Sequence, residues 1–373
     1  MNNKKNILIL ESLSHIAGGQ RVLLNILPYI KDDFLITVLV PSAGAFSDSL
    51  KELEINVEFI DPGRYSAGKK NIFDVLKYLS LFPVNLIRSF RFIKKSDLVY
   101  VNSTRVLPVG IIGGIIFNKP VIWHNHSLIS DQKTKTVLNW LTRLSSLKKI
   151  IAVSEAVAND FPNLVDKTEI IFNGVDLNEF KPKEEEIKSS LKDIIVVGDL
   201  MPTKGQDFLI NSLTLLSDLE YHLKIIGSVR AGSERYELNL KKLIKELNLE
   251  NRIEFLGRRS DINTLMLQAD LLILPSTVSE ACPLVVLEAI ACGVPVIASD
   301  LGGTKEIIKD NYIGYTFKTG DKIDLADKIN CFFNLNPEKI SEMKKNCRRE
   351  AEQKYNLENN AKRINKIIND VLR

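Results

Sequence analysis

The sequence predicts an α/β protein made of two doubly wound, Rossmann-like parallel-sheet domains. Short apolar runs typical of buried parallel strands alternate with helical stretches along most of the chain. This alternation occurs in two series, separated by a segment rich in Asn, Pro, Lys and Glu at residues 173–193. A length of 373 residues, with 45% hydrophobic and 26% charged residues, is sufficient for two separate cores.

The first series opens with an apolar strand at 6–10, a turn at Gly18 and Gly19, and a helical pattern at 20–30. Five more strands are predicted at 35–40, 57–60, 98–102, 121–124 and 150–154. The second series predicts strands at 194–198, 223–227, 253–256, 271–274, 296–299 and 314–317. A final helix at 357–372 follows the completed second sheet.

The most informative segment is 279–303, which carries Glu280 and Glu288. Pro275 and Ser276 end the strand before it, and Pro283 prevents a helix from starting earlier than 284. Glu280 is therefore expected on the loop at the carboxyl end of a strand, and Glu288 about one turn inside the next helix. Ligands bind at such strand ends, and carboxylates there can hold the hydroxyls of a sugar or ribose. The sequence neighbours of Glu288 are apolar, and burial of an unpaired carboxylate is costly. This setting favours a functional role for Glu288 over a role in solubility alone.

This segment resembles the signature of the retaining glycosyltransferases of family 4, nucleotide-sugar enzymes with the GT-B fold. The family signature is Glu, seven residues, Glu and then Ala-Cys-Gly-x-Pro-Val, which here is Glu280, Glu288 and 291–296. The resemblance covers nearly the whole chain and implies two Rossmann-like domains facing across a cleft. It implies an acceptor-binding domain at 1–172, onto which a helix at 352–373 crosses back, and a nucleotide-sugar-binding domain at 173–351.

Lys204 follows the strand that ends at Gly198 and can reach a diphosphate there. The family pattern is Gly-Arg-Leu, three residues, Lys-Gly, and its Arg and Lys hold the diphosphate. Asp199 stands where the family has Arg, so part of this clamp is missing, and Arg230 or Lys305 are candidate replacements. The alternative for Lys204 is a solvated loop lysine.

The resemblance also assigns roles to residues of the first domain. Gly18 and Gly19 match the glycine pair that faces the transferred sugar and the diphosphate, although a simple tight turn would also explain them. His126 matches a histidine that contacts donor or acceptor, with His124 as the alternate. Ser154 matches a serine at a strand end, and residues 173–176, Asn-Gly-Val-Asp, match a turn with positive φ at the hinge.

The resemblance implies three catalytic residues, Glu280, His126 and Lys204, and no metal ligand. The expected donor-binding residues are Gly18, Gly19, Gly198, Lys204, Arg258, Glu280, Ala281, Cys282, Pro283, Leu284, Val285 and Glu288. Arg258 lies where the family reads the base, and the N–H groups of Gly302 and Gly303 are expected to help carry the leaving charge. Ala281, Cys282 and Pro283 replace the commoner Gly-Phe-Gly, which leaves the donor sugar open.

The implied function is metal-independent, retaining transfer of a hexose to an acceptor hydroxyl, with no cofactor besides the donor. UDP-sugar is favoured over GDP-sugar, and the expected acceptor is a glycan or lipid-linked glycan of an envelope, capsular or extracellular polysaccharide. The alternatives are a sugar-nucleotide epimerase, a phosphorylase-like hydrolase of the same fold, or a non-catalytic nucleotide-binding subunit. Asp199 keeps the last alternative open.

The distribution of charged and apolar residues indicates the kind of partner and the cellular location of the protein. Residues 1–165 hold 20 Lys and Arg against 13 Asp and Glu, which suggests an anionic partner such as a phospholipid surface. The basic residues lack aromatic interleaving, which argues against nucleic acid. Residues 73–95 predict two basic amphipathic pieces broken at Pro83, which either lie on a membrane or pack on the sheet.

The chain has four cysteines without metal-ligand spacing, no apolar run long enough to span a membrane and no signal peptide before the first strand. We therefore expect a cytoplasmic protein. It would lie on the inner face of the membrane if the basic pieces bind lipid. No histidine that could serve as its base lies near Cys282 in sequence, so a nucleophilic role for this thiol is disfavoured.

Overall fold

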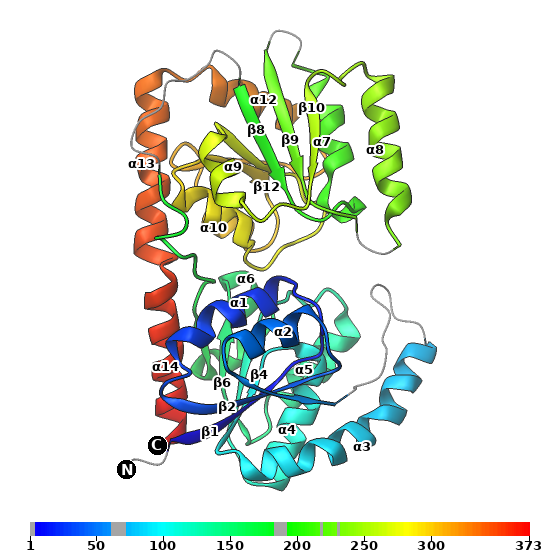
Figure 1. Ribbon diagram of the computed structural model, residues 1–373, viewed down its shortest axis with the longest axis vertical. Coiled ribbons are helices and arrows are strands. Elements are labelled where there is room, and N and C mark those ends of the chain that lie inside the picture. Colours follow the sequence, from blue (N-terminus) through cyan, green and yellow to red (C-terminus); the bar gives the residue numbers. More distant parts are fainter. Residues whose placement is uncertain (1–3, 61–71, 183–191, 217–218, 230–231) are drawn as a thin grey trace. The chain divides into compact units, whose positions relative to one another are not determined.

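The computed structural model describes residues 4–60, 72–182, 192–216, 219–229 and 232–373, without the side chains of 72–80. The chain divides into two compact units (Figure 1). Unit 1 comprises Met1–Gly174 and Leu357–Arg373, and unit 2 comprises Val175–Asn356. The sequence placed these divisions at 172/173 and 351/352. The second of them falls inside helix α13 (Pro337–Lys354) of unit 2, so residues 352–354 do not belong to the returning segment.

Unit 1 contains a sheet of seven parallel strands in the order β3-β2-β1-β4-β5-β6-β7. The strands are β1 (Lys5–Leu10), β2 (Phe34–Val40), β3 (Asn56–Phe59), β4 (Leu98–Val101), β5 (Val121–Asn125), β6 (Leu147–Ala152) and β7 (Thr168–Ile170). The six strands predicted for this unit are present, with small shifts at their ends. The edge strand β7 was not predicted, because three half-exposed residues leave no apolar signal.

The helices of unit 1 cover this sheet (Figure 1). They are α1 (Gly18–Ile26), α2 (Ala45–Glu52), α3 (Ile72–Lys95), α4 (Leu107–Ile116), α5 (Gln132–Leu141), α6 (Glu155–Ala158) and α14 (Leu357–Leu372), with short 3-10 helices at Leu27–Tyr29, Thr104–Val106 and Pro162–Lys167. The C-terminal helix α14 packs on α1 and β6. This is the arrangement that the family resemblance implies.

Three helical predictions need correction. The glycine pair is not a turn before a helix, because Gly18 and Gly19 form the first residues of α1 itself. The helix predicted at 20–30 is α-helical only as far as Ile26, because Pro28 has no N–H to donate to the preceding turn. The predicted break at Pro83 is wrong, because α3 continues through it.

Unit 2 contains six parallel strands in the order β10-β9-β8-β11-β12-β13. The strands are β8 (Lys192–Val197), β9 (Tyr221–Ile226), β10 (Ile253–Gly257), β11 (Leu271–Leu274), β12 (Val296–Ser299) and β13 (Gly314–Phe317). Besides α13, the helices are α7 (Gln206–Leu213), α8 (Glu234–Glu246), α9 (Ile262–Gln268), α10 (Leu284–Ala291), α11 (Thr304–Ile307) and α12 (Lys322–Phe333), with a 3-10 helix at Pro202–Lys204. All six predicted strands of this unit are present.

Each sheet reverses its strand order at one point, between β1 and β4 in unit 1 and between β8 and β11 in unit 2. In open α/β sheets the loops at the carboxyl ends of the two strands beside such a point diverge, which opens a ligand crevice. The loops after these four strands are therefore the expected positions of the candidate site residues. Within the described ranges, none of the helices combines the length and apolar character needed to cross a bilayer.

Candidate functional site

In unit 2, the loop after β8 is held tightly against the loop after β11. Gly205 has φ +68°, and a Cβ at this position would lie 2.0 Å from the carbonyl oxygen of Pro275. Only glycine fits such a backbone at such an approach. The N–H of Thr277 donates to Thr203 O at 3.0 Å and ties the two loops together. This contact brings Lys204, which immediately precedes Gly205, to the end of β11.

Lys204 and Glu280 form an ion pair across this point, with Nζ 2.9 Å from Oε1. The hydroxyl of the buried Ser276 donates a hydrogen bond to the same carboxylate oxygen. Gly198 lies beneath the lysine, since a Cβ there would stand 3.6 Å from Lys204 Cδ. The structure thus brings together three of the predicted residues and adds Ser276. A polar residue just beyond a buried strand, after Pro275, was the signal for it in the sequence.

Glu288 lies on α10, the helix that follows the Glu280 loop, and is 8% exposed. Burial and the negative charge of Glu288 raise the pKa of the Cys292 thiol to about 12. The predicted residues Ala281, Cys282, Leu284 and Val285 lie in the loop and first turn that lead into this helix. Pro283 is the N-cap residue of α10, and its side chain has no acceptor with which to cap the first N–H groups of this helix.

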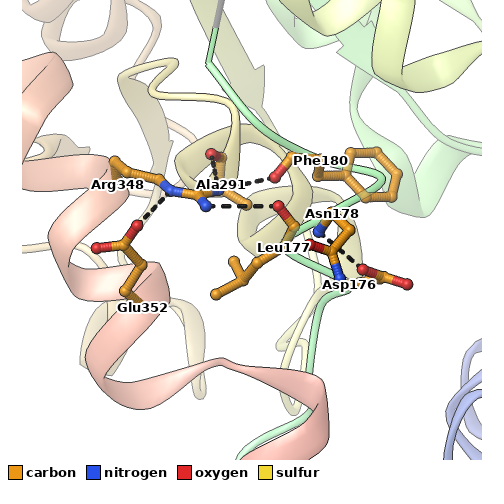
Figure 2. Close-up of polar contacts among 7 residues, drawn as sticks. All are labelled: Asp176, Leu177, Asn178, Phe180, Ala291, Arg348 and Glu352. Atoms are coloured by element: carbon orange, nitrogen blue, oxygen red, sulfur yellow. Dashed lines mark hydrogen bonds and ion pairs between the residues drawn. The ribbon is translucent and has the colours of Figure 1, made fainter.

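The opposite end of α10 is anchored by Arg348 of α13 (Figure 2). Its guanidinium donates to Ala291 O at 3.0 Å, at the C-terminus of α10, and to Phe180 O at 2.9 Å. Its Nε donates to Glu352 at 2.7 Å, which fixes the plane of the guanidinium. One cation therefore joins α13, the helix that carries Glu288, and the first segment of unit 2.

In unit 1, Gly19 lies against His126. A Cβ at Gly19 would stand 3.2 Å from His126 Cδ2, so any larger residue at this position would press on the His126 ring. His126 Nε2 lies 2.9 Å from Asn102 Oδ1. The alternate, His124, is buried, and its Nδ1 is 2.7 Å from the hydroxyl of Tyr100. Burial lowers the pKa of His126 to about 3 and, together with the His126 ring, lowers that of His124.

Several predicted residues do not join these clusters. Arg258 is exposed after the edge strand β10, two strands away from β8. The N–H of Gly303 donates to Glu280 O at 2.8 Å, so this group is not available to a leaving charge here. Lys305 is exposed on α11, and Arg230 lies outside the described residues, so neither is shown to replace the arginine absent at Asp199.

Two other motif residues have structural tasks. The hydroxyl of Ser154 accepts a hydrogen bond from Val157 N and caps α6. The expected positive φ at Asn173 or Gly174 is absent. Gly174 is required instead because a Cβ there would lie 2.5 Å from Leu357 Cα, at the start of α14. Among the described residues, no group of three or more His, Cys, Asp or Glu is arranged to hold a metal ion.

Two family models match the chain. "Glycosyltransferase Family 4" matches residues 16–179, and "Glycosyl transferases group 1" matches residues 178–354. Together they span nearly all of both units. The chain is thus a glycosyltransferase of the group 1 and family 4 type, with two Rossmann-like parallel-sheet domains as in the GT-B fold.

Individual relatives agree with this assignment. The chain is 28% identical to an uncharacterized glycosyltransferase of Methanocaldococcus jannaschii, over 75% of this chain and 80% of the relative. It is 24% identical to the UDP-Gal:alpha-D-GlcNAc-diphosphoundecaprenol alpha-1,3-galactosyltransferase of Escherichia coli, over 98% and 96% of the two chains. The crystal structure of Anabaena Alr3699/HepE in complex with UDP superposes with a TM-score of 0.85 at 26% identity, covering 98% of this chain and 100% of that one.

Proposed function

We propose that this protein is a retaining, metal-independent glycosyltransferase that moves a sugar from a UDP-sugar to an acceptor hydroxyl. The observation that carries the proposal is the Lys204–Glu280 pair at the point where the strand order of unit 2 reverses. A cation suits a diphosphate and a carboxylate suits sugar hydroxyls, so this pair at a strand-order reversal supports the proposal. Support for uridine comes from the similar Anabaena protein, whose structure holds UDP.

The roles proposed for unit 2 follow from this geometry. Lys204 holds the diphosphate and stabilises its negative charge as it leaves, together with the N–H groups at the start of α10. Glu280, held by Ser276, orients the sugar hydroxyls. Glu288 binds the ribose hydroxyls from α10. Retention then proceeds by front-face attack, in which the departing phosphate takes the proton of the acceptor hydroxyl.

The proposed acceptor is a glycan or lipid-linked glycan, and unit 1 carries a surface suited to an anionic membrane. Ile87 on α3 is 64% exposed, and Ile115 and Ile116 at the end of α4 are also exposed. The two helices pack together, with Phe90 and Phe117 in edge-to-face contact. The same helix α3 carries exposed cations at Arg88, Arg91, Lys94 and Lys95. Apolar residues bordered by cations are typical of interfacial membrane binding.

The test is a screen of UDP- and GDP-sugars by thermal shift, followed by a transfer assay with a lipid extract as acceptor. Transfer that preserves the anomeric configuration, unaffected by EDTA, is expected. Inversion, or loss of activity with EDTA, would contradict the mechanism. Tight UDP binding without transfer would support the non-catalytic subunit that Asp199 suggests, and sugar epimerisation without acceptor would support an epimerase.

Glu288→Gln provides a sharper test of the donor site. The neutral amide accepts less strongly from ribose hydroxyls, so UDP affinity should fall while the thermal unfolding midpoint stays near that of the parent protein. Exposed Glu246→Gln on α8 is the matched control. Unchanged UDP affinity in Glu288→Gln would remove the ribose role.

A further inference from the structure

Two buried polar residues in unit 1 have no role in the transfer chemistry proposed above. Glu11 directly follows β1, and Asn102 directly follows β4. Their strands are neighbours, and Leu10 pairs with Val101 in the register, so both residues leave the sheet at the same level. Each is 3% exposed. They therefore occupy the floor of the point where the strand order of unit 1 reverses.

The Glu11 carboxylate is surrounded by neutral donors. Asn102 Nδ2 donates to Oε2 at 2.7 Å, and the N–H groups of Ser12 and Leu13 donate to Oε1 at 2.5 and 3.2 Å. The side chain of Gln20 donates as well. Burial raises the pKa of Glu11, and these hydrogen bonds oppose that rise. Since a carboxylate offers about four acceptor positions, this one is fully used by its neighbours.

The same groups hold the start of α1. Asn102 Nδ2 also donates to Gly19 O at 3.3 Å. Gln20 accepts from Ala17 N through Oε1 at 3.1 Å, while its amide group faces Glu11. The first turn of α1, which contains the glycine pair, is thereby attached to the ends of β1 and β4 by side chains that share one carboxylate.

Asn102 also fixes the proton position on His126. Because Gly19 O and the Glu11 carboxylate are acceptors, the side-chain nitrogen of Asn102 must face them, and its oxygen must face His126. His126 Nε2, 2.9 Å from that oxygen, must therefore carry the hydrogen. A neutral ring then has its lone pair on Nδ1, which is shielded from solvent and has no hydrogen-bond partner among the described residues.

We infer that Glu11, Asn102 and Gln20 are positioning residues for the proposed transferase reaction. They hold the glycine pair of α1 and a single tautomer of His126 in one fixed arrangement, and these are the residues that the family resemblance expects to contact donor or acceptor. The inference rests on the proposed function for its kinetic consequence, whereas its consequence for the His126 tautomer is independent of any activity.

The tautomer is measured by ¹⁵N NMR of the histidine rings. The chain has only four histidines, and His126→Gln identifies the signal. The parent protein should show His126 protonated at Nε2 alone. Asn102→Asp, with one proton shared between its inner oxygen and the Glu11 carboxylate, keeps an acceptor facing Nε2 and should preserve this tautomer. Asn102→Leu removes the acceptor and should yield a mixture. Glu11→Gln presents an amide to Asn102, favours reversal of the Asn102 amide, and should shift His126 toward the Nδ1-protonated form.

The kinetic arm uses the same variants, with the exposed Glu52→Gln on α2 as control. Glu11→Gln and Asn102→Leu should lower kcat/KM roughly 10- to 100-fold, because small displacements of positioned groups are costly, and Asn102→Asp should recover part of the loss. Identical His126 signals in all variants, or unchanged kcat/KM with a shifted tautomer, would overturn the inference. If Asn102→Leu fails to fold, the comparison of Glu11→Gln with Asn102→Asp in both measurements decides whether the inference holds. Absence of transfer in the parent protein would refute the proposed function alone, and the NMR result would still decide whether the network sets the tautomer.

Discussion

The ammonium group of Lys204 lies 2.9 Å from the carboxylate of Glu280, so the two groups proposed to bind different parts of the donor are paired with each other in the ligand-free protein. Lys204 and Glu280 keep 29% and 18% of their side chains exposed, so water still screens part of their attraction. A diphosphate offers Lys204 more negative charge than one carboxylate does. Donor binding can therefore replace this ion pair at small cost, which frees Glu280 for the sugar.

This relationship predicts opposite effects for two substitutions. Lys204→Met should weaken UDP binding about 10- to 100-fold, because charge-assisted hydrogen bonds are lost. Glu280→Gln should leave UDP affinity equal or raise it up to about fivefold, because Lys204 is released, while turnover of UDP-sugar falls. Calorimetry with UDP and a transfer assay measure both, and the exposed Lys322→Met is the control. Weaker UDP binding in Glu280→Gln would contradict the replacement of the ion pair.

A second prediction concerns the glycine that holds the Lys204 loop. Gly205→Ala forces a Cβ to within 2.0 Å of Pro275 O at φ +68°, whereas Gly320→Ala has φ +82° with open space around it. Gly320→Ala should cost roughly 1–2 kcal/mol of unfolding free energy from its backbone conformation alone. Gly205→Ala should cost at least about 1 kcal/mol more through the clash, and should also weaken UDP binding. Urea unfolding and calorimetry measure the two effects. Equal losses in the two variants would show that the close approach is unimportant.

Features of the fold and of the candidate site could be predicted where residues adjacent in sequence signal them. The buried parallel strands were predictable because both faces are covered, which makes runs such as Leu271–Leu274 continuously apolar. Lys204 and Glu280 could be placed at strand ends from local signals. Their direct pairing could not, because it depends on the strand order of the sheet, which brings β8 next to β11.

The roles of Glu11 and Asn102 were missed for a related reason. They stand 91 residues apart and become partners only because β1 and β4 pair. A lone polar residue after a strand does not reveal its partner. Likewise, Gly174 was assigned to a positive-φ turn, since the sequence shows a glycine but not the Leu357 backbone that excludes a side chain there.

A third prediction concerns Arg348, whose guanidinium joins α13, α10 and the segment after Val175 (Figure 2). Arg348→Lys keeps the charge but cannot reach several carbonyls at once, so it should lower the unfolding free energy by about 2 kcal/mol or more. Arg349→Lys, at the neighbouring exposed position, should change it by no more than about 0.5 kcal/mol. Similar values for both variants in urea unfolding would show that the carbonyl contacts contribute little.

A fourth prediction tests the proposed membrane surface on α3 and α4. Ile87→Asp places a negative charge among Arg88, Arg91 and the apolar side chains, so binding to vesicles with anionic lipid should fall about tenfold or more. Leu238→Asp, on an equally exposed apolar position of α8, should leave binding unchanged. Sedimentation with phosphatidylcholine vesicles, with and without phosphatidylglycerol, measures this at low and high salt. Equal binding to neutral vesicles at every salt concentration would remove the proposal.

A fifth prediction follows from the low pKa of His126, which burial lowers to about 3. An unfolded chain protonates this ring near pH 6.5, whereas the folded protein does not, so the folded state loses stability as the pH falls from 6.5 toward 3. At pH 5 the loss attributable to His126 is about 2 kcal/mol, from 1.36 kcal/mol for each pH unit. His126→Gln has no such proton to bind, and its unfolding free energy should fall less steeply over this range. Urea unfolding at pH 7, 6 and 5 measures the difference, with the same substitution at exposed His15 for comparison. Parallel curves for the parent protein and His126→Gln would show that His126 titrates normally in the folded state, and that its ring is open to water rather than held in the Asn102 network.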